Sequence, residues 1–298
     1  MIASFEHFKV GATGQGGFDL NPHFACVQGW RGDVFDTDVF FAIKDSSFHA
    51  GCLWGQTRQS STVNRQIRLQ PWGITNQNDL AARLRAAGLP VRTEVPITVT
   101  CRDFAKTYFL DLVVADTAIY ELKTALGLIG EHEAQLLNYL LLRGANHGKL
   151  INFRPGQVES RFINTTLTHH ERRQFEIQTR DWQEHDQTDK IFRENLIAML
   201  QDWGCWLDLA LYTEALVHFA GGETRVVQLL PSVRGEVSLG KQHFNLLNVE
   251  TAFRVTALTT GTEHYERHLR SLLCLSPLRA IQWINLARNR VQLVSLIK

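Results

Sequence analysis

Residues 108–140 read YFLDLVVADTAIYELKTALGLIGEHEAQLLNYL, and they place three charged side chains inside two apolar runs. Asp111 lies in the first run, and Glu121 and Lys123 lie in the second. Apolar runs of this length favour β-strands, and the interiors of strands are depleted in charged residues. The fold alone therefore gives no reason for these three charges.

The two runs are expected to pair as an antiparallel hairpin with its turn at residues 115–117. The turn is centred midway between Asp111 and Glu121, so the two acids should face each other. Directly opposed like charges are destabilising, and a divalent cation between them would neutralise them. Glu121 and Lys123 are two residues apart and share a face of the strand. The pattern predicts one small site with oxygen ligands for Mg²⁺ or Mn²⁺, beside a lysine that orients or deprotonates an attacking water or stabilises a phosphate.

The sequence after the hairpin predicts a leucine-rich helix over residues 131–144, which ends at Gly144. Gln135 and Tyr139 are four residues apart and therefore lie on one face of this helix. Their amide and hydroxyl groups are placed to hydrogen-bond the charged site or a substrate phosphate. Alone, each pattern also fits an exposed charged hairpin or an ordinary helix.

The rest of the chain predicts an α/β protein with helices packed on a sheet. In the first half we expect a helix at 76–88, with Asn76 or Asn78 near its N-cap, and strands at 91–101, 107–114, 118–124, 148–153 and 159–167. Residues 170–195 are polar, and we expect a connector there. In the second half we expect helices at 209–222 and 264–276 and strands within 224–233, 244–258 and 279–297.

The second half repeats the order of the first, which predicts two tandem copies. At an offset of 133, LINFRPGQVESRFI aligns with WINLARNRVQLVSL and Asn152 with Asn285. At an offset of 134, DLVVADTAIYELK aligns with NLLNVETAFRVTA, which gives the charged trio the counterparts Asn245, Val255 and Ala257. The second copy is thus expected to be degenerate. The predicted domains are 69–175 and 185–298, after an N-terminal segment, 1–68, of unclear fold.

Composition narrows the class of protein without naming a partner. The net charge of +1 does not indicate a nucleic-acid binder, although residues 264–298 carry six Arg and Lys residues against one Glu. That cluster fits a phosphate-binding surface and a solvated surface equally well. No long apolar run and no signal peptide is evident, so we expect no membrane partner. Five scattered cysteines without a CxxC pair argue against disulfides and zinc or iron–sulfur sites and favour a cytoplasmic protein.

The D…ExK trio followed by QxxxY resembles the PD-(D/E)XK nuclease superfamily in its RecB-like branch. Over residues 80–167 the chain looks like the bacterial GxxExxY proteins of that superfamily. The resemblance implies a restriction-endonuclease-like mixed sheet flanked by helices and a metal at Asp111, Glu121 and Leu122. It also implies that Lys123 serves the water and that Gln135 and Tyr139 support the site.

The chain departs from that family on the first helix. The family's glutamate and tyrosine should fall near residues 71–81, where this chain has Gly73 and Asn76. In the second half Gly204 and Tyr212 match the longer members, but Asp208 lies one place from the expected glutamate. These departures bear on whether the chain is active.

Two functions of different class follow as hypotheses. The first is a Mg²⁺- or Mn²⁺-dependent nuclease that hydrolyses phosphodiester bonds in DNA, with RNA as the other candidate substrate. The second is a catalytically inactive nuclease fold that binds nucleic acid or serves in assembly. A structural α/β protein with an incidental charged hairpin is the third reading. An internal pseudo-dimer is expected from the repeat, and the oligomeric state stays open.

Overall fold

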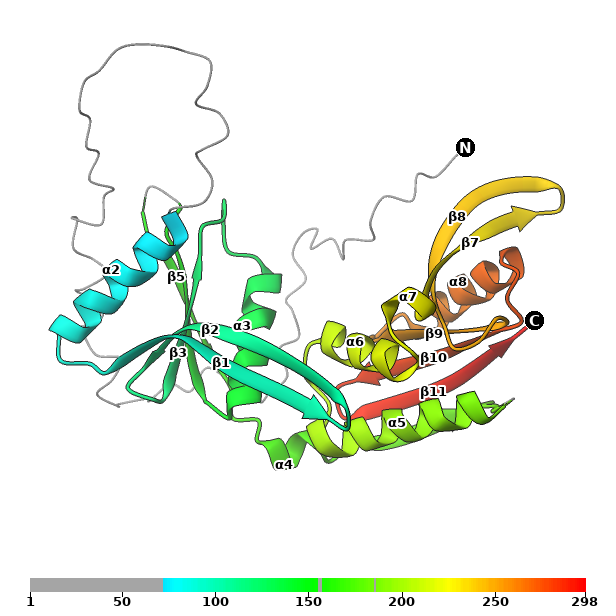
Figure 1. Cartoon of the computed structure of the whole chain (residues 1–298), viewed down its shortest axis with the longest axis horizontal. Coiled ribbons are helices and arrows are strands. Elements are labelled where there is room, and N and C mark those ends of the chain that lie inside the picture. The colour runs from blue at the N-terminus through cyan, green and yellow to red at the C-terminus, as the bar shows by residue number, and fades with distance from the viewer. Residues whose placement is uncertain (1–71, 155–156, 185) are drawn as a thin grey trace, which may run out of the picture.

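The computed structural model describes residues 72–154, 157–184 and 186–298 of the chain. The predicted N-terminal segment 1–68 lies outside the described residues. Two mixed sheets lie side by side, each flanked by helices, and the last strand of the second sheet carries the C-terminus (Figure 1). The predicted α/β architecture of mixed sheets flanked by helices is confirmed.

The first sheet has the strand order β1-β2-β3-β4-β5. Only β3 and β4 are parallel in it, and the α3 crossover joins them, as a parallel pair requires. The elements are α2 (Trp72–Ala86), β1 (Val91–Cys101), β2 (Phe104–Val114), β3 (Ala118–Lys123), α3 (Gly130–Arg143), β4 (His147–Asn152) and β5 (Glu159–Asn164).

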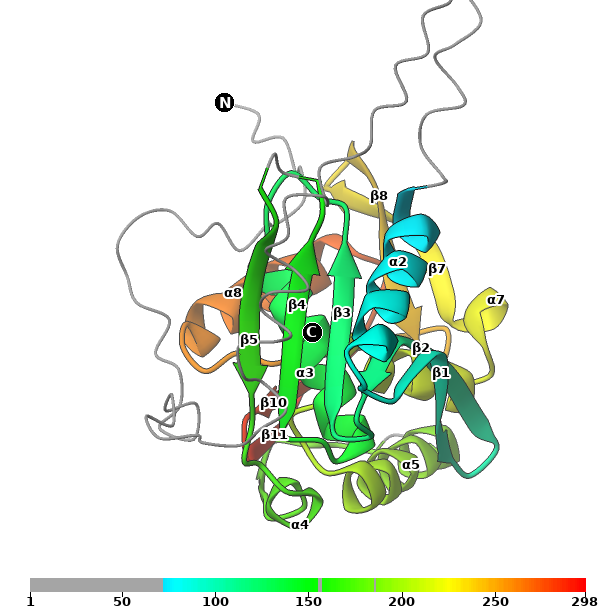
Figure 2. The same ribbon diagram turned by 90° about the vertical axis from the view of Figure 1, so that its left-hand side faces the viewer.

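Helices cover both faces of the first sheet (Figure 2). On one face, Leu80 and Leu84 of α2 pack against Leu112 and Tyr120. On the other face, Leu136, Tyr139 and Leu140 of α3 pack against the sheet. The site predicted from the sequence lies on this second face, since β-strand side chains alternate between faces and Gln135 and Tyr139 belong to α3.

The second sheet has the order β6-β11-β10-β9-β8-β7. Its helices are α5, α6, α7 and α8, and the short helix α4 precedes it. The elements are α4 (His169–Arg172), β6 (Glu176–Arg180), α5 (Gln187–Trp203), α6 (Leu209–Phe219), α7 (Glu223–Val226), β7 (Val227–Arg234), β8 (Val237–Leu246), β9 (Thr251–Thr256), α8 (Thr262–Leu275), β10 (Ala280–Ala287) and β11 (Arg290–Ile297).

Two expectations about local structure were wrong. The segment 170–195 is no simple connector, because it contains α4, β6 and the first half of α5. Strand β6 has no buried residue and is held by parallel pairing with β11, so its sequence lacks the apolar alternation that marks a strand. The first helix begins at Trp72, which puts Asn76 and Asn78 inside it rather than at its N-cap.

The strands and crossover helix of the first sheet recur in the second. From β7 to β11 the chain forms two antiparallel pairings, a crossover through α8 to a parallel strand, and a final antiparallel pairing, as it does from β1 to β5. The last residue pair of each parallel ladder is Lys123 with Asn152 and Thr256 with Asn285. Both halves of the chain therefore share one topology.

The register fixes the offset between the two halves at 133 for this part of the sheet. Leu112 pairs with Tyr120 in the first hairpin, and Asn245 pairs with Phe253 in the second. The expected offset of 134 is therefore wrong here, and a shift of one residue moves a side chain to the other face. The counterparts of Asp111, Glu121 and Lys123 are Phe244, Arg254 and Thr256. The trio is absent from the second sheet at either offset.

The two sheets share a hydrophobic core. Val99, Cys101 and Phe104 at the tip of the β1–β2 hairpin pack with α5 and α6, and the Trp203 indole donates to the carbonyl of Thr100 at 2.8 Å. The hairpin reaches across to these helices in Figure 1. No helix in the described part of the chain is both long and apolar enough to cross a membrane.

Candidate active site

The β2–β3 hairpin has the predicted turn and register. Val113 pairs with Ile119 and Val114 with Ala118, and the turn occupies residues 115–117. The same register, continued by two residues, places Asp111 opposite Glu121. The predicted turn and the register of the hairpin up to the Leu112–Tyr120 pair are confirmed.

Asp111 turns toward the backbone of β3 rather than forming another ladder pair. Its Oδ2 accepts a hydrogen bond from the backbone N–H of Leu122 at 2.7 Å. Burial raises the pKa of Asp111, and the hydrogen bond from Leu122 and the charge of Lys123 oppose that rise. Asp111 is therefore fixed in position by the strand that carries the other acid.

The other four predicted side chains form one continuous chain of contacts. The Lys123 ammonium donates to Glu121 Oε1 at 2.8 Å and to Gln135 Oε1 at 2.6 Å. The Gln135 amide donates in turn to the Tyr139 hydroxyl oxygen at 2.8 Å. Strand β3 and helix α3 therefore bring together the two motifs that the sequence analysis singled out.

Glu121 lies in an unfavourable environment for a carboxylate. It is 3% exposed, and its Oε2 has no hydrogen-bond partner among the described residues. Burial, followed by the charge of Asp111, raises the pKa of Glu121 to about 7, and Lys123 opposes the rise. A buried carboxylate oxygen without a partner carries a desolvation cost that a cation would offset.

The two acids of the site have the chemistry of ligands for a divalent cation whose remaining ligands would come from outside the protein. Within the described residues, no three His, Cys, Asp or Glu side chains form a group that could hold a metal. Mg²⁺ characteristically binds one or two carboxylates and keeps waters and substrate phosphates as its other ligands. Asp111 and Glu121 supply the two carboxylates, whereas Leu122 has only its carbonyl oxygen to offer.

Two residues near the site were missed by the sequence analysis. Gln77 of α2 is buried, and its amide nitrogen donates to Glu94 Oε1 at 2.7 Å and to the carbonyl of Asp111 at 2.8 Å. Glu94 lies opposite Asp111 in the β1–β2 register and has a φ of 50°, an unusual value for a strand residue. The first helix thus reaches the site through Gln77, one residue after the position expected for an acid.

Glu94 could have been found from the β1–β2 turn. A turn at Arg102 and Asp103 is centred midway between Glu94 and Asp111, by the same symmetry that places Asp111 opposite Glu121. The charge of Glu94 acts on both acids of the site, since it raises the pKa of Asp111 and the pKa of Glu121. No sequence pattern marked Gln77, because the way α2 packs on the sheet determines which of its side chains reach the site.

The acids of the first turn of α3 are outside this arrangement. Glu133 forms an ion pair with Arg161 of β5 at 2.6 Å, and Arg161 also contacts Glu159. His132 accepts a hydrogen bond from the backbone N–H of Ile129 at 3.3 Å, and so contributes to the start of the helix. These two side chains therefore contribute to the start of α3 and to its contact with β5.

Comparison with known proteins gives one family match, to the part of the chain that forms the first sheet. The sequence model of the PD-(D/E)XK nuclease superfamily matches residues 74–164. A solved structure titled "Crystal structure of SSO0001" is 24% identical over 33% of this chain and 52% of that chain, with a TM-score of 0.27. This chain therefore covers about half of that one, and the TM-score is too low for the likeness to carry an argument. No curated protein matches the chain.

The matched range runs from α2 to β5, and it includes all five side chains of the predicted site. The predicted superfamily is therefore confirmed, while the match does not distinguish the GxxExxY branch. Residues 74–164 of this chain form a domain of the PD-(D/E)XK nuclease superfamily.

Proposed function

We propose that the first sheet carries a metal-dependent nuclease site that hydrolyses phosphodiester bonds in DNA. The observation that carries the proposal is the Glu121 carboxylate, which is buried opposite Asp111 with one oxygen bound to Lys123 and the other without a described partner. A structural role would favour an apolar residue here, since burying a charge is costly. A cation bound by the two carboxylates would explain why both acids are buried at this place.

Each side chain has a defined role in this proposal. Asp111 and Glu121 would hold Mg²⁺ or Mn²⁺, and the bound ion would supply Lewis-acid chemistry toward the phosphate and the attacking water. Lys123 lies beside the metal position, where its ammonium orients the water and balances charge on the phosphate. Gln135 and Tyr139 position Lys123, because Gln135 accepts from the lysine and donates to the tyrosine.

We infer that the second sheet is a degenerate copy of the first. Asn152 donates to the carbonyl of Ala125 at 2.9 Å and accepts from its N–H at 3.0 Å. Asn285 donates to the carbonyl of Leu258 at 2.9 Å and accepts from its N–H at 2.7 Å. Both pairs are related by the offset of 133. Shared topology together with a shared buried clamp supports a tandem duplication and an internal pseudo-dimer. We propose that the two copies are the predicted domains 69–175 and 185–298, although β6 precedes the second of these and pairs with its last strand.

The test is cleavage of supercoiled plasmid and of single-stranded DNA and RNA in Mg²⁺ or Mn²⁺. We expect metal-dependent cleavage of DNA by the wild-type protein and its loss in Asp111→Asn. Asp116→Asn is the matched control, since Asp116 is an exposed acid in the turn of the same hairpin and pairs with Arg92. Equal activity in all three proteins would refute the site. Cleavage of RNA alone would show that the substrate is RNA rather than DNA.

A second function is supported by the first helix. Gln77 reaches the site where the family resemblance predicts an acid, so α2 contributes no carboxylate there. A nuclease fold that only binds nucleic acid would therefore keep the same structure. DNA binding without cleavage in either metal, with affinity unchanged in Asp111→Asn, would select this alternative.

A further inference from the structure

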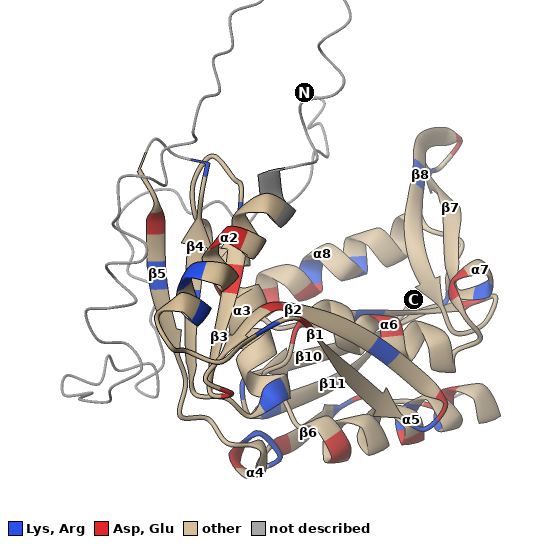
Figure 3. Cartoon of the chain, turned by 60° about the vertical axis from the view of Figure 1, so that its left-hand side comes forward, with Lys and Arg blue, Asp and Glu red and all other residues tan. Residues whose placement is uncertain are grey.

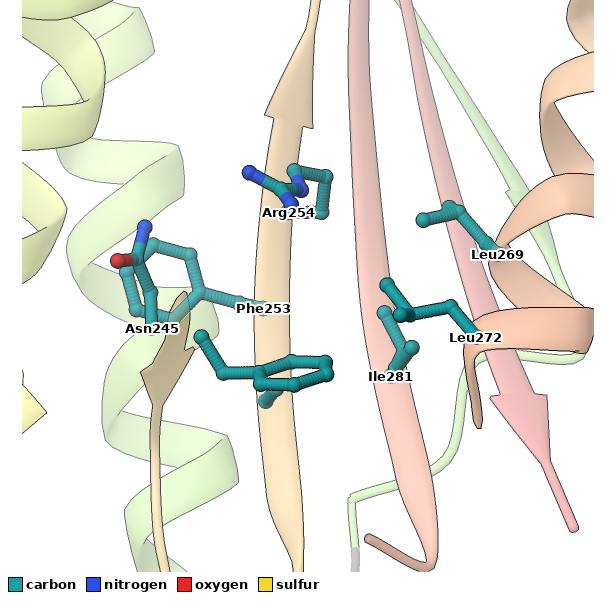
Figure 4. A pocket seen from close by; sticks show the side chains of 8 residues that line it. Asn245, Phe253, Arg254, Leu269, Leu272 and Ile281 are labelled. Carbon is teal, nitrogen blue, oxygen red and sulfur yellow. The ribbon is translucent and has the colours of Figure 1, made fainter. Parts of the chain in front are cut away.

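A small cavity lies in the second sheet at the place that corresponds to the active site of the first. It has a volume of about 10 Å³ and lies between β8, β9, β10 and α8 (Figure 4). At the offset of 133, three of its lining residues are counterparts of site residues: Phe244 of Asp111, Arg254 of Glu121 and Leu272 of Tyr139. The second sheet therefore keeps the position of the site with different chemistry.

Arg254 inverts the charge at the position of the buried glutamate. It is the one exposed residue in β9, where the other five residues are buried. Figure 4 shows its side chain on β9 between Asn245 of β8 and the leucines of α8. No hydrogen bond or ion pair joins its guanidinium to another described residue, although its charge lowers the pKa of Tyr265 against the effect of burial. A basic side chain thus stands where the first sheet has an acidic one.

The same cavity has lost the groups that hydrolysis would need. Phe244 offers no oxygen in place of Asp111. Thr256, the counterpart of Lys123, is buried, and its hydroxyl donates to Asn285 at 2.8 Å and accepts from the Trp283 indole at 2.9 Å. Phe244 has no atom that could bind a metal, and the hydroxyl of Thr256 already serves these two buried contacts.

We propose that Arg254 binds a backbone phosphate of nucleic acid directly, in the position where the first sheet would do so through a metal. A guanidinium presents paired donors that match phosphate oxygens. The cavity is too small to admit a nucleotide, so the phosphate lies at its mouth. This inference rests on the proposed nucleic-acid substrate but not on cleavage.

The distribution of charge supports a discrete contact rather than a basic stripe. Lys and Arg are interspersed with Asp and Glu on the elements around both sheets (Figure 3). Two arginines near α8 already have partners, since Arg180 and Arg270 both pair with Glu266. Arg254 has no such partner among the described residues, so its charge is available to a phosphate without loss of an ion pair.

The experiment measures binding of the full chain to a short fluorescent DNA duplex in EDTA, over a range of salt concentrations. We expect Arg254→Gln to weaken binding about threefold to tenfold and to reduce the slope of log affinity against log salt by about one. Arg254→Lys should keep part of the affinity. Arg290→Gln is the matched control, because Arg290 is exposed on β11, two strands from β9 in the same sheet.

The outcomes separate this inference from the proposed function. Unchanged affinity in Arg254→Gln, or an equal loss in Arg290→Gln, would overturn the phosphate contact even if the protein cleaves DNA. Arg254-dependent binding by a protein that cleaves nothing would refute the nuclease and support the contact. The melting temperatures of the variants should match that of the wild type, since Arg254 is exposed.

Discussion

The two sheets of this chain keep one scaffold and differ where chemistry would occur. Asn152 and Asn285 are both fully buried, and each binds the backbone of the residue 27 positions earlier through the same two hydrogen bonds. Beside these clamps, Glu121 and Lys123 of the first sheet are replaced by Arg254 and Thr256 in the second. The two sheets thus share the asparagine clamp and differ in the charged pair, so a comparison of variants can separate residues that stabilise the fold from residues that serve a site.

The largest expected effect concerns the lysine and its threonine counterpart. Lys123→Met should lower the rate of plasmid cleavage by about 10²–10⁴-fold, the contribution of a positioned acid–base group. Thr256→Val in the second sheet should leave the rate per folded molecule within about twofold of wild type. Initial rates, corrected for folded fraction by circular dichroism, measure both. A similar loss in Thr256→Val would show that the second sheet takes part in the reaction and would break the comparison.

The next effect is a pH dependence that only the first sheet should show. The folded protein binds the Glu121 proton more tightly than the unfolded chain, because the pKa of Glu121 is raised to about 7. The raised pKa of Glu121 therefore adds up to about 3 kcal/mol to the free energy of unfolding below about pH 4.5. This contribution is lost as the pH rises through about 7. Urea unfolding in EDTA between about pH 4.5 and 7.5 measures this loss.

Variants assign that loss to Glu121. Glu121→Gln should remove most of the pH dependence and should be more stable than wild type above pH 7 without metal, while Arg254→Gln should follow the wild-type curve. Asp111 keeps a smaller dependence of the same sign, since burial also raises its pKa. Mg²⁺ at about 100 times its dissociation constant should restore about 2.7 kcal/mol to the wild type and nothing to Glu121→Gln. A parallel pH curve for Glu121→Gln would contradict the assignment.

A smaller effect tests the shared clamp. Asn152→Ala and Asn285→Ala each leave a backbone N–H and carbonyl without a partner, at a cost of about 1–3 kcal/mol. Asn285→Ala should cost more, because Asn285 also accepts from Thr256 and donates to Gln292 at 2.8 Å. Urea unfolding at one pH measures both, and Asn138→Ala is the comparison, because this buried asparagine accepts from a single backbone N–H, that of Asp208, at 3.0 Å and should cost less. A negligible cost for either variant would mean that the repeated contact is not a structural requirement.

The sequence predicted those parts of the molecule that depend on local order. The hairpin register followed from the symmetry of its turn, and helix periodicity indicated that Gln135 and Tyr139 share the face of α3 that could hydrogen-bond the charged site. Strand β1 was predicted with the bounds that the structure has, because its apolar positions alternate. The helix–strand order of both halves was also evident, since apolar periodicity reports each element separately.

Other parts depended on contacts that the sequence does not show. Strand β6 exists through its pairing with β11, and Gln77 reaches Asp111 only once α2 has packed on the sheet. The offset of 134 came from a short match of DTA with ETA, whereas Leu247 bonds to Thr251 in the second hairpin as the 133 register requires. A one-residue error of this kind leaves the fold unchanged and assigns every counterpart wrongly.

The smallest expected effect concerns the join between the sheets. Lys106 of β2 forms an ion pair with Glu214 of α6 at 2.5 Å, and the glutamate is half exposed. Solvent screening limits such a pair to about 0.2–1 kcal/mol. A double-mutant cycle with Lys106→Met and Glu214→Gln should therefore give a coupling energy in that range that shrinks as salt rises.

Because Trp203 and the shared apolar core also join the sheets, unfolding should stay a single transition in all four proteins. Two separate transitions in the double variant would show that the copies are coupled mainly through this pair, and that the core between them contributes less than its burial indicates.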